Sequence, residues 1–240
     1  MLKKILAGAG VALALMAMVA HADEAALKQA LQAKFPKTDI ESVTPTPLPG
    51  LYEVFSNGQI FYTDAHANYA IVGGNLIDVN KRVSLTEERL RKLTAVNFSE
   101  LPLDLAMKKV VGNGNHKLAY FADPNCPYCK RFEHDLAGLH DVTIYTFLYP
   151  VLGKDSVKKA KAVWCSGDRQ KVWDEWMLNG VPLPAADNCD TTQIGQILAL
   201  GHKLNVTATP TLIFANGERV AGAISVAELE AHFAAPPVSK

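Results

Sequence analysis

Two cysteines separated by two residues are the part of this sequence best suited to chemistry. Cys126 and Cys129 enclose Pro127 and Tyr128 in the stretch FADPNCPYCK. Such a pair could anchor a haem, bind a metal, form a small structural disulfide or exchange disulfides with another molecule. A c-type haem requires histidine directly after the second cysteine, where this chain has Lys130, so a haem site is excluded.

The other two cysteines narrow the remaining choices. Cys165 and Cys189 are too far apart in the sequence to complete a typical zinc site, which uses two close pairs. A disulfide between Cys126 and Cys129 closes so small a loop that it restricts the unfolded chain little. Zinc and a purely structural bridge stay as alternatives, and disulfide exchange is favoured. The spacing also favours a second disulfide, between Cys165 and Cys189.

The predicted elements around the pair give disulfide exchange a physical basis. A strand over 117–121 leads into a helix that begins at or just after Cys126. The first N–H groups of a helix lack partners and its dipole is positive there, so both favour a thiolate on Cys126. The pKa of such a thiol falls to between about 3.5 and 7.5. Cys129 follows one turn later on the same face, where it can resolve a mixed disulfide.

The C-terminal part of the chain alternates strand-like and helix-like segments. The glycines and asparagines over 112–115 predict a hairpin-like turn between two strands. Farther on, Thr209-Pro210 opens a predicted strand, where proline is either cis in a tight turn or an ordinary trans residue of an edge strand. Ser225 and Glu228 have the spacing of a capping box and predict the start of a final helix.

The N-terminal part predicts export followed by a small α+β unit. Residues 1–22 combine two lysines, an apolar run and a small-residue cleavage pattern. We therefore expect a secretory signal peptide, cleavage before Asp23 and a periplasmic location. A helix is expected over 24–34 and a turn-rich connection over 43–50. The Asn-Gly pair at 57–58 predicts a hairpin.

A charged helix follows this unit. Ser84 and Glu87 form a capping-box pattern at the start of a helix expected over 84–96, which fits a linker arm or an ordinary surface helix.

The chain has 24 basic and 24 acidic residues and no basic block, so nucleic acid is not an expected partner. No metal or cofactor is expected, because the seven histidines form no close cluster. The tryptophans are expected to pack: Trp164, Trp173 and Trp176.

The order of these features resembles the thioredoxin fold. A strand, the Cys-Pro-Tyr-Cys motif at a helix start, a Thr-Pro pair before a hairpin and a final helix all match it. In that fold the proline is cis and faces the active cysteines. The resemblance carries onto Cys126, Cys129 and Pro210, with Thr209 beside the site. Tyr128 is expected to be exposed, where it either touches the substrate or covers the disulfide.

The whole chain is more narrowly similar to the DsbC/DsbG family of periplasmic disulfide isomerases. The similarity covers FADPNCPYC, the segment AVWCSGDRQKVWDEWM and the downstream ADNCD. It implies a homodimer, misfolded disulfide-containing exported proteins as substrates, and a membrane thiol reductase like DsbD as electron donor. It also implies an α/β (α+β) layout: a signal peptide over 1–22, a cystatin-like dimerisation domain over 23–82, a linker helix over 83–103 and a thioredoxin-like domain with a helical insertion over 104–240.

Three features relate this chain to particular members of these groups. Pro127 and Tyr128 between the cysteines are typical of DsbG-type members. The pair Cys165 and Cys189 matches the second, structural disulfide of DsbC-type members, and we expect the chain to be closer to DsbC. Thioredoxin has a buried aspartate where this chain has Tyr120, so the Cys129 proton must leave through water or another group. The nearby acid at 123 is expected to be solvated or to act as a cap.

The resemblance implies that Cys126 attacks substrate disulfides and that Cys129 resolves the mixed disulfide. The expected function is a periplasmic disulfide isomerase and reductase. One alternative is a DsbG-like reductase that protects single cysteines oxidised to sulfenic acid. Another is a dimeric chaperone whose thiols are not essential. A dithiol oxidase is disfavoured, because the N-terminal unit would then have no role.

Overall fold

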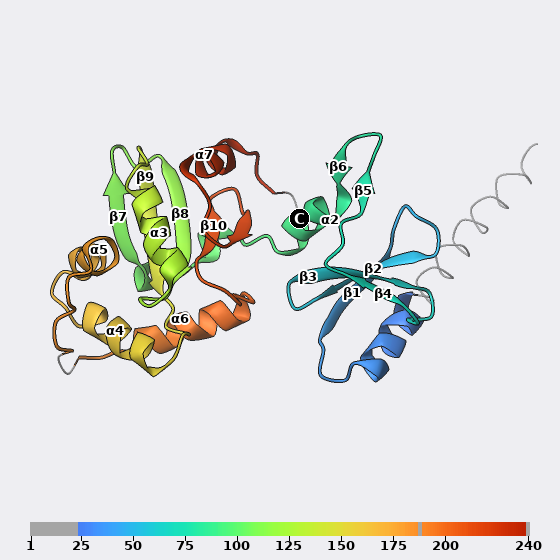
Figure 1. Cartoon of the computed structure of the whole chain (residues 1–240), viewed down its shortest axis with the longest axis horizontal. Coiled ribbons are helices and arrows are strands. Elements are labelled where there is room, and N and C mark those ends of the chain that lie inside the picture. The colour runs from blue at the N-terminus through green and yellow to red at the C-terminus, as the bar shows by residue number, and fades with distance from the viewer. Residues whose placement is uncertain (1–23, 187–188, 239–240) are drawn as a thin grey trace, which may run out of the picture. The chain divides into compact units, whose positions relative to one another are not determined.

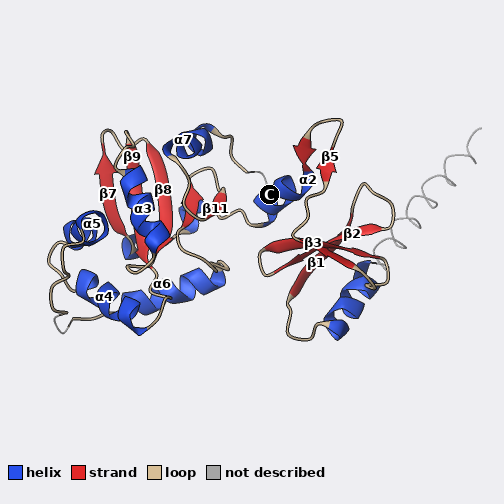
Figure 2. Cartoon of the chain, in the orientation of Figure 1, coloured by secondary structure: helices blue, strands red, loops and turns tan. Residues whose placement is uncertain are grey.

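The computed structural model describes residues 24–186 and 189–238, so the predicted signal peptide lies outside the described residues. The chain divides into two compact units between Leu90 and Arg91 (Figure 1). Each unit combines helices with strands and has a hydrophobic cluster of its own (Figure 2). Every helix in the described part of the chain is too short or too polar to cross a membrane.

The first unit packs a helix over 24–34 against an antiparallel sheet. The sheet has four strands in chain order: β1 (Ile40–Pro45), β2 (Leu51–Ser56), β3 (Gln59–Asp64) and β4 (Ala70–Val72). Leu27 and Leu31, one helical turn apart, are buried against Ile40 and Val54 of the sheet. The apolar face of the helix therefore covers the apolar face of the sheet.

Of the two turns that the sequence predicts in this unit, the structure confirms one in full and corrects the bounds of the other. The predicted hairpin is confirmed, since Asn57 and Gly58 join β2 to β3 with φ values of +50° and +76°. Both angles lie in the left-handed region that such a two-residue turn requires. The predicted connection over 43–50 is wrong at its start, because β1 continues to Pro45. Proline is tolerated there because β1 is an edge strand.

A short hairpin precedes the charged helix. The elements are β5 (Ile77–Asp78), β6 (Val83–Ser84) and α2 (Leu85–Leu93). The Ser84 hydroxyl accepts the N–H of Glu87 at 3.2 Å, as the cap prediction requires. Helix α2 is shorter than the predicted 84–96, and a 3-10 turn (Phe98–Glu100), capped by Asn97, follows it.

The second unit is built on a five-stranded sheet. Its strand order is β11 (Arg219–Ala221), β10 (Thr211–Phe214), β8 (His116–Ala122), β9 (Val142–Leu148) and β7 (Met107–Val111). Only β8 and β9 are parallel, and α3 (Pro127–Leu136) connects them. Both strands are almost wholly buried, as parallel strands covered on both faces usually are.

Helices complete this unit. Three of them connect β9 to β10 as an insertion: α4 (Lys154–Trp164), α5 (Arg169–Asn179) and α6 (Thr192–Lys203). The last helix, α7 (Val226–Ala234), begins at the capping box that Ser225 and Glu228 form, which confirms that prediction. A further 3-10 turn (Leu103–Leu105) precedes β7.

The predicted hairpin at 112–115 is wrong, because β9 lies between β7 and β8 in the sheet. The turn itself forms, and it packs against the start of β9. A Cβ atom added to Gly114 would lie 2.6 Å from the Thr143 hydroxyl, and the N–H of Asn113 donates to the Asp141 carboxylate at 2.8 Å. The glycines therefore permit a close approach to a third strand, which neighbouring residues alone do not reveal.

Candidate active site

The loop between β8 and α3 holds the cysteine pair. Cys126 is the N-cap of α3, and its Sγ accepts the N–H of Cys129 at 3.3 Å. Pro127 occupies the first turn, where its missing N–H removes no helical bond. Both sulfurs belong to free cysteines, and the residues are buried. The helix start therefore supplies donors to Cys126, as the sequence predicted.

A second loop from far along the chain meets this helix start. Strand β10 pairs antiparallel with β8, with Thr211 opposite Phe121, so the start of β10 lies at the end of β8. The Cys126 thiol donates to the carbonyl oxygen of Thr209 at 3.1 Å. The Thr209–Pro210 peptide is cis, and Pro210 is buried. The four predicted residues Cys126, Cys129, Thr209 and Pro210 are therefore brought to one place.

The two thiols have opposite electrostatic surroundings. The hydrogen bond from the Cys129 thiol, together with the Thr209 side chain and the backbone N–H groups of Cys129 and Tyr128, outweighs burial and lowers the pKa of Cys126 from 9.0 to about 6. The pKa of Cys129 is raised strongly, first because its thiol donates to Cys126 and then because it is buried. Near neutral pH the negative charge therefore resides on Cys126, and Cys129 stays protonated.

Asp123 is not the solvated acid that the sequence suggested. Its side chain is wholly buried and accepts four hydrogen bonds. The donors are the N–H groups of Asn125, Val151 and Leu152 and the hydroxyl of Ser156, at 2.7–2.9 Å. This carboxylate joins the cysteine loop to the segment after β9 and to the start of α4. The N-caps of α3 and α4 are Cys126 and Gly153, so Asp123 is a buried bridging group and neither of the two expected roles describes it.

Tyr128 has the exposure that a substrate contact needs. Its side chain is 60% exposed, although both neighbouring cysteines are buried. The guanidinium carbon of Arg131 lies 5.6 Å from the centre of its ring. Tyr128 therefore presents an aromatic surface beside the thiols.

Comparisons with known proteins match both units. A family described as a thioredoxin-like domain matches residues 103–235, and one described as the disulfide bond isomerase protein N-terminal domain matches residues 18–87. The probable thiol:disulfide interchange protein DsbC of Bordetella avium (strain 197N) is 49% identical over 204 residues, which cover 85% of this chain and 72% of the relative. The chain belongs to the DsbC family. It is therefore a thiol–disulfide oxidoreductase of the disulfide isomerase class, with the α/β thioredoxin-like fold that its sequence predicted.

A more distant member of the DsbC family and a solved structure are also similar to this chain. The thiol:disulfide interchange protein DsbC of Escherichia coli (strain K12) is 30% identical over 212 residues, covering 85% of this chain and 84% of the relative. The crystal structure of a disulfide interchange protein from Neisseria gonorrhoeae is 40% identical, with a TM-score of 0.52. The matched region covers 55% of the present chain and 96% of the chain in the Neisseria gonorrhoeae structure.

Sequence reasoning missed one buried group in this DsbC-family site. The Glu133 carboxylate accepts hydrogen bonds from the Tyr120 hydroxyl and the Trp173 indole N–H. Burial raises the pKa of Glu133, and burial followed by the Glu133 charge raises that of Tyr120. A signal existed, because Glu133 belongs to the buried stripe of α3 with Cys129 and Leu136. An acid within an apolar stripe requires a buried partner.

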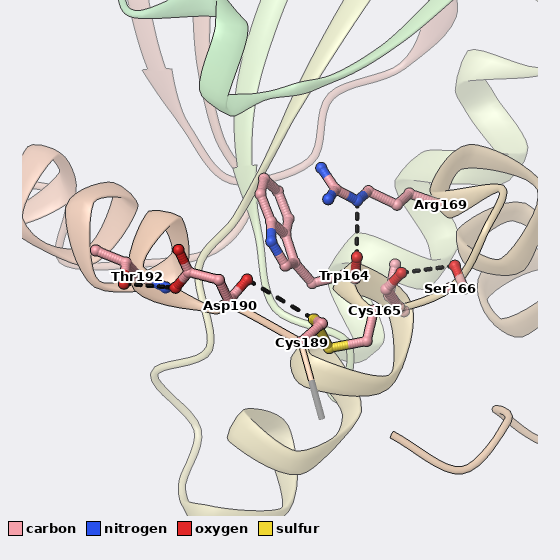
Figure 3. Close-up of a disulfide and its surroundings, with 8 residues drawn as sticks. Trp164, Cys165, Ser166, Arg169, Cys189, Asp190 and Thr192 are labelled. Carbon is pink, nitrogen blue, oxygen red and sulfur yellow. Dashed lines mark hydrogen bonds between the residues drawn. A yellow bond between two sulfur atoms is a disulfide. The ribbon is translucent and has the colours of Figure 1, made fainter. Parts of the chain in front are cut away.

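The other two cysteines form a disulfide in the insertion, as the spacing predicted (Figure 3). Cys165 ends α4, and Cys189 precedes α6, whose first N–H at Thr192 donates to the Asp190 carboxylate at 2.9 Å. The bond spans 24 positions and holds both ends of the segment that contains α5. Within the described residues no group of three or more His, Cys, Asp or Glu side chains could hold a metal ion.

Proposed function

We propose that the reduced chain rearranges wrong disulfides in exported proteins through the Cys126 thiolate. Cys126 Sγ bonds to one substrate sulfur, and the other substrate sulfur leaves as a thiolate that takes a proton from water. A free substrate thiol then attacks the mixed disulfide or another bridge. When Cys126 leaves again as a thiolate, the substrate has new pairings and the enzyme is unchanged.

Resolution of the mixed disulfide by Cys129 reduces the substrate instead of rearranging it. Cys129 loses its proton and attacks the mixed disulfide, which forms the Cys126–Cys129 disulfide and releases a substrate thiol. The oxidised pair then needs two electrons from a dithiol. We propose that a membrane thiol reductase like DsbD supplies them in the periplasm, which the signal-like segment 1–22 supports.

One observation carries this proposal: Cys126 Sγ lies at the N-cap of α3, where it accepts the Cys129 N–H at 3.3 Å and its pKa is lowered to about 6. A thiolate of this kind is both populated and able to leave near neutral pH. We assign Thr209 and Pro210, which lie beside Cys126, to the binding of substrate. Tyr128 adds an exposed aromatic contact.

The N-terminal unit supports a proposed homodimer. Strand β4 forms one edge of its sheet, and all three of its residues are exposed. The side chains of Tyr69, Ile71 and Val72 are 80%, 54% and 77% exposed. An exposed apolar edge is a template for pairing with another strand. We therefore assign dimerisation to 23–82 and substrate chemistry to 104–240, with 83–103 as the linker.

Refolding of a scrambled protein with several disulfides tests the main function. Wild type should restore native pairings, and Cys126→Ser should lose at least about a hundredfold of that rate, because a hydroxyl is not ionised near neutral pH. Equal rates for the two proteins would contradict the thiolate mechanism. Suppressed aggregation with rearrangement independent of Cys126 would instead identify a chaperone.

The DsbG-like alternative has its own support in Pro127 and Tyr128, which separate the cysteines. A protein with a single cysteine oxidised to sulfenic acid distinguishes it. Sulfenic acid reduction much faster than disulfide rearrangement would favour that alternative, and the reverse order would favour the isomerase.

A further inference from the structure

The ammonium groups of two lysines lie over the indole ring of Trp176 on α5. The Nζ atoms of Lys130 and Lys159 lie 4.2 and 4.5 Å from the centre of the indole. Ammonium groups at this distance are attracted by the negative face of the ring. Trp164 and Trp173 are buried, as packing residues should be, whereas Trp176 packs on the core and remains partly exposed.

A cavity of about 500 Å³ opens beside this indole. Its lining includes both apolar and basic side chains: Lys158, Lys159, Ala162, Trp176, Pro182 and Leu183. A volume of this size is in the range of cavities that hold small ligands. It can therefore take an apolar side chain and the residue next to it in an extended peptide.

Two hydrogen bonds connect the cavity to the cysteine loop. The Trp176 indole N–H donates to the carbonyl oxygen of Pro124 at 2.7 Å, and Lys159 donates to the Asn125 side chain at 2.7 Å. Pro124 and Asn125 directly precede Cys126. A peptide in the cavity is therefore within a few residues' reach of the sulfur that attacks.

The charge around the cavity is positive. Lys130, Lys158 and Lys159 supply three positive charges, and among the described acids Asp155 contacts Lys159 at 2.8 Å. Lys158 lines the cavity and is exposed, so its charge is available to a ligand. The two acids of α5 pair with other lysines, Asp174 with Lys109 at 2.8 Å and Glu175 with Lys171 at 3.9 Å.

We infer that this cavity binds an acidic residue next to an apolar one in the polypeptide whose disulfide Cys126 attacks. The inference rests on the proposed function and adds a substrate preference to it. Lysines attract the carboxylate, and the indole with Leu183 covers the apolar side chain. Nucleophilic attack remains at Cys126, and the cavity increases the time that a suitable segment spends beside it.

Short peptides with one cysteine test this preference. Each peptide carries a 2-pyridyl disulfide, so attack by Cys126 forms the mixed disulfide and releases pyridine-2-thione, which is measured by absorbance. The residues beside the cysteine are Glu-Leu, Gln-Leu or Lys-Leu. The Glu-Leu peptide should react about two- to fivefold faster than the Lys-Leu peptide, the range expected for one partly exposed ion pair. The difference should disappear in about 0.5 M salt.

A pair of variants separates the cavity from general surface charge. Lys158→Glu should remove or reverse the preference, whereas Lys161→Glu should keep it, because Lys161 is exposed on the same helix but does not line the cavity. Equal rates for the three peptides, or equal effects of the two variants, would overturn the inference and leave the proposed function intact. Failure of wild type to attack any peptide would contradict the proposed function itself.

Discussion

At the scale of single residues, the direction of the reaction depends on which sulfur carries the charge. Cys126 and Cys129 are both buried, yet the pKa of one is lowered and that of the other is raised. The difference arises because Cys126 receives hydrogen bonds at a helix start, whereas Cys129 donates one. A nucleophile and a protonated resolving thiol thus come from one turn of helix.

The pH dependence of alkylation tests this asymmetry. The rate at Cys126 should rise with pH around a midpoint of about 6. Cys129→Ala should move the midpoint upward, because it removes the largest cause of the shift, and Cys129→Ser should move it less, because a hydroxyl can still donate. A midpoint near 9 in wild type would contradict the assignment.

The same shift has a consequence for the stability of the reduced protein. The pKa of Cys126 is lower in the folded protein than in the unfolded one, so its stabilisation is present above pH 9 and is lost as the pH falls to about 6. Urea unfolding of the reduced proteins measures this effect. The free energy of unfolding of wild type, relative to that of Cys126→Ala, should increase as the pH rises from about 6 to 9. An advantage that is constant with pH would contradict the shift.

Glu133 gives a second prediction at this scale. Glu133→Ala leaves the buried hydroxyl of Tyr120 and the indole N–H of Trp173 without their acceptor, which should cost about 2–4 kcal/mol of unfolding free energy. Glu133→Gln keeps a carbonyl acceptor and should cost less. Because burial raises the pKa of Glu133, wild type should lose stability relative to Glu133→Gln as the pH rises above 4.5. Urea unfolding of the three proteins at several pH values measures both effects, and equal losses for the two variants would contradict the hydrogen-bond role.

At the scale of elements, α4 connects the reactive loop to the disulfide. Near its start Ser156 donates to Asp123 and accepts from Asn125, and at its end Cys165 bonds to Cys189. The helix has 11 residues, so its ends are separated by about 16 Å. The disulfide therefore constrains the insertion without touching the reacting sulfur.

Removal of both cysteines tests this separation of roles. The double variant Cys165→Ala, Cys189→Ala should lose roughly 3 kcal/mol of stability, because its unfolded chain is no longer restricted by a bridge across 24 positions. The alkylation rate of Cys126 in the folded variant should stay as in wild type. Calorimetry and alkylation measure the two effects, and a slower Cys126 reaction in the folded state would show that the bridge also shapes the site.

At the scale of the whole molecule, the proposed function assigns association and chemistry to different compact units. The exposed strand β4 belongs to the first compact unit, and the thiols belong to the second. Isomerisation of a large substrate requires binding as well as attack, whereas reduction of a small disulfide requires only the thiolate. Loss of the dimer should therefore affect the two activities differently.

Charges placed on β4 test this division. Ile71→Lys with Val72→Lys should halve the mass in solution, because lysines on an edge strand oppose pairing. Rearrangement of a scrambled protein should fall, and the alkylation rate of Cys126 should not change. Val79→Lys is the control, since Val79 is 78% exposed but lies outside β4. A monomeric wild type, or a dimer that survives the double change, would contradict the assignment.

The sequence alone determined the features that depend on neighbouring residues. The Cys-Pro-Tyr-Cys helix start, the turn at Asn57-Gly58 and the cap at Ser225 follow from local backbone geometry, and the structure has all three. Local hydrogen bonds and φ preferences are present wherever these residues occur. They can therefore be predicted without knowledge of the rest of the chain.

Only the tertiary structure decided the features that require distant segments to meet. It placed β9 between β7 and β8 and brought Thr209 to Cys126 across 83 positions of sequence. It also brought the Trp173 indole N–H to the Glu133 carboxylate and buried the Asp123 carboxylate, which accepts four hydrogen bonds. Such contacts depend on how sheet and insertion pack together, because a buried polar group is stable only where the whole fold supplies its partner.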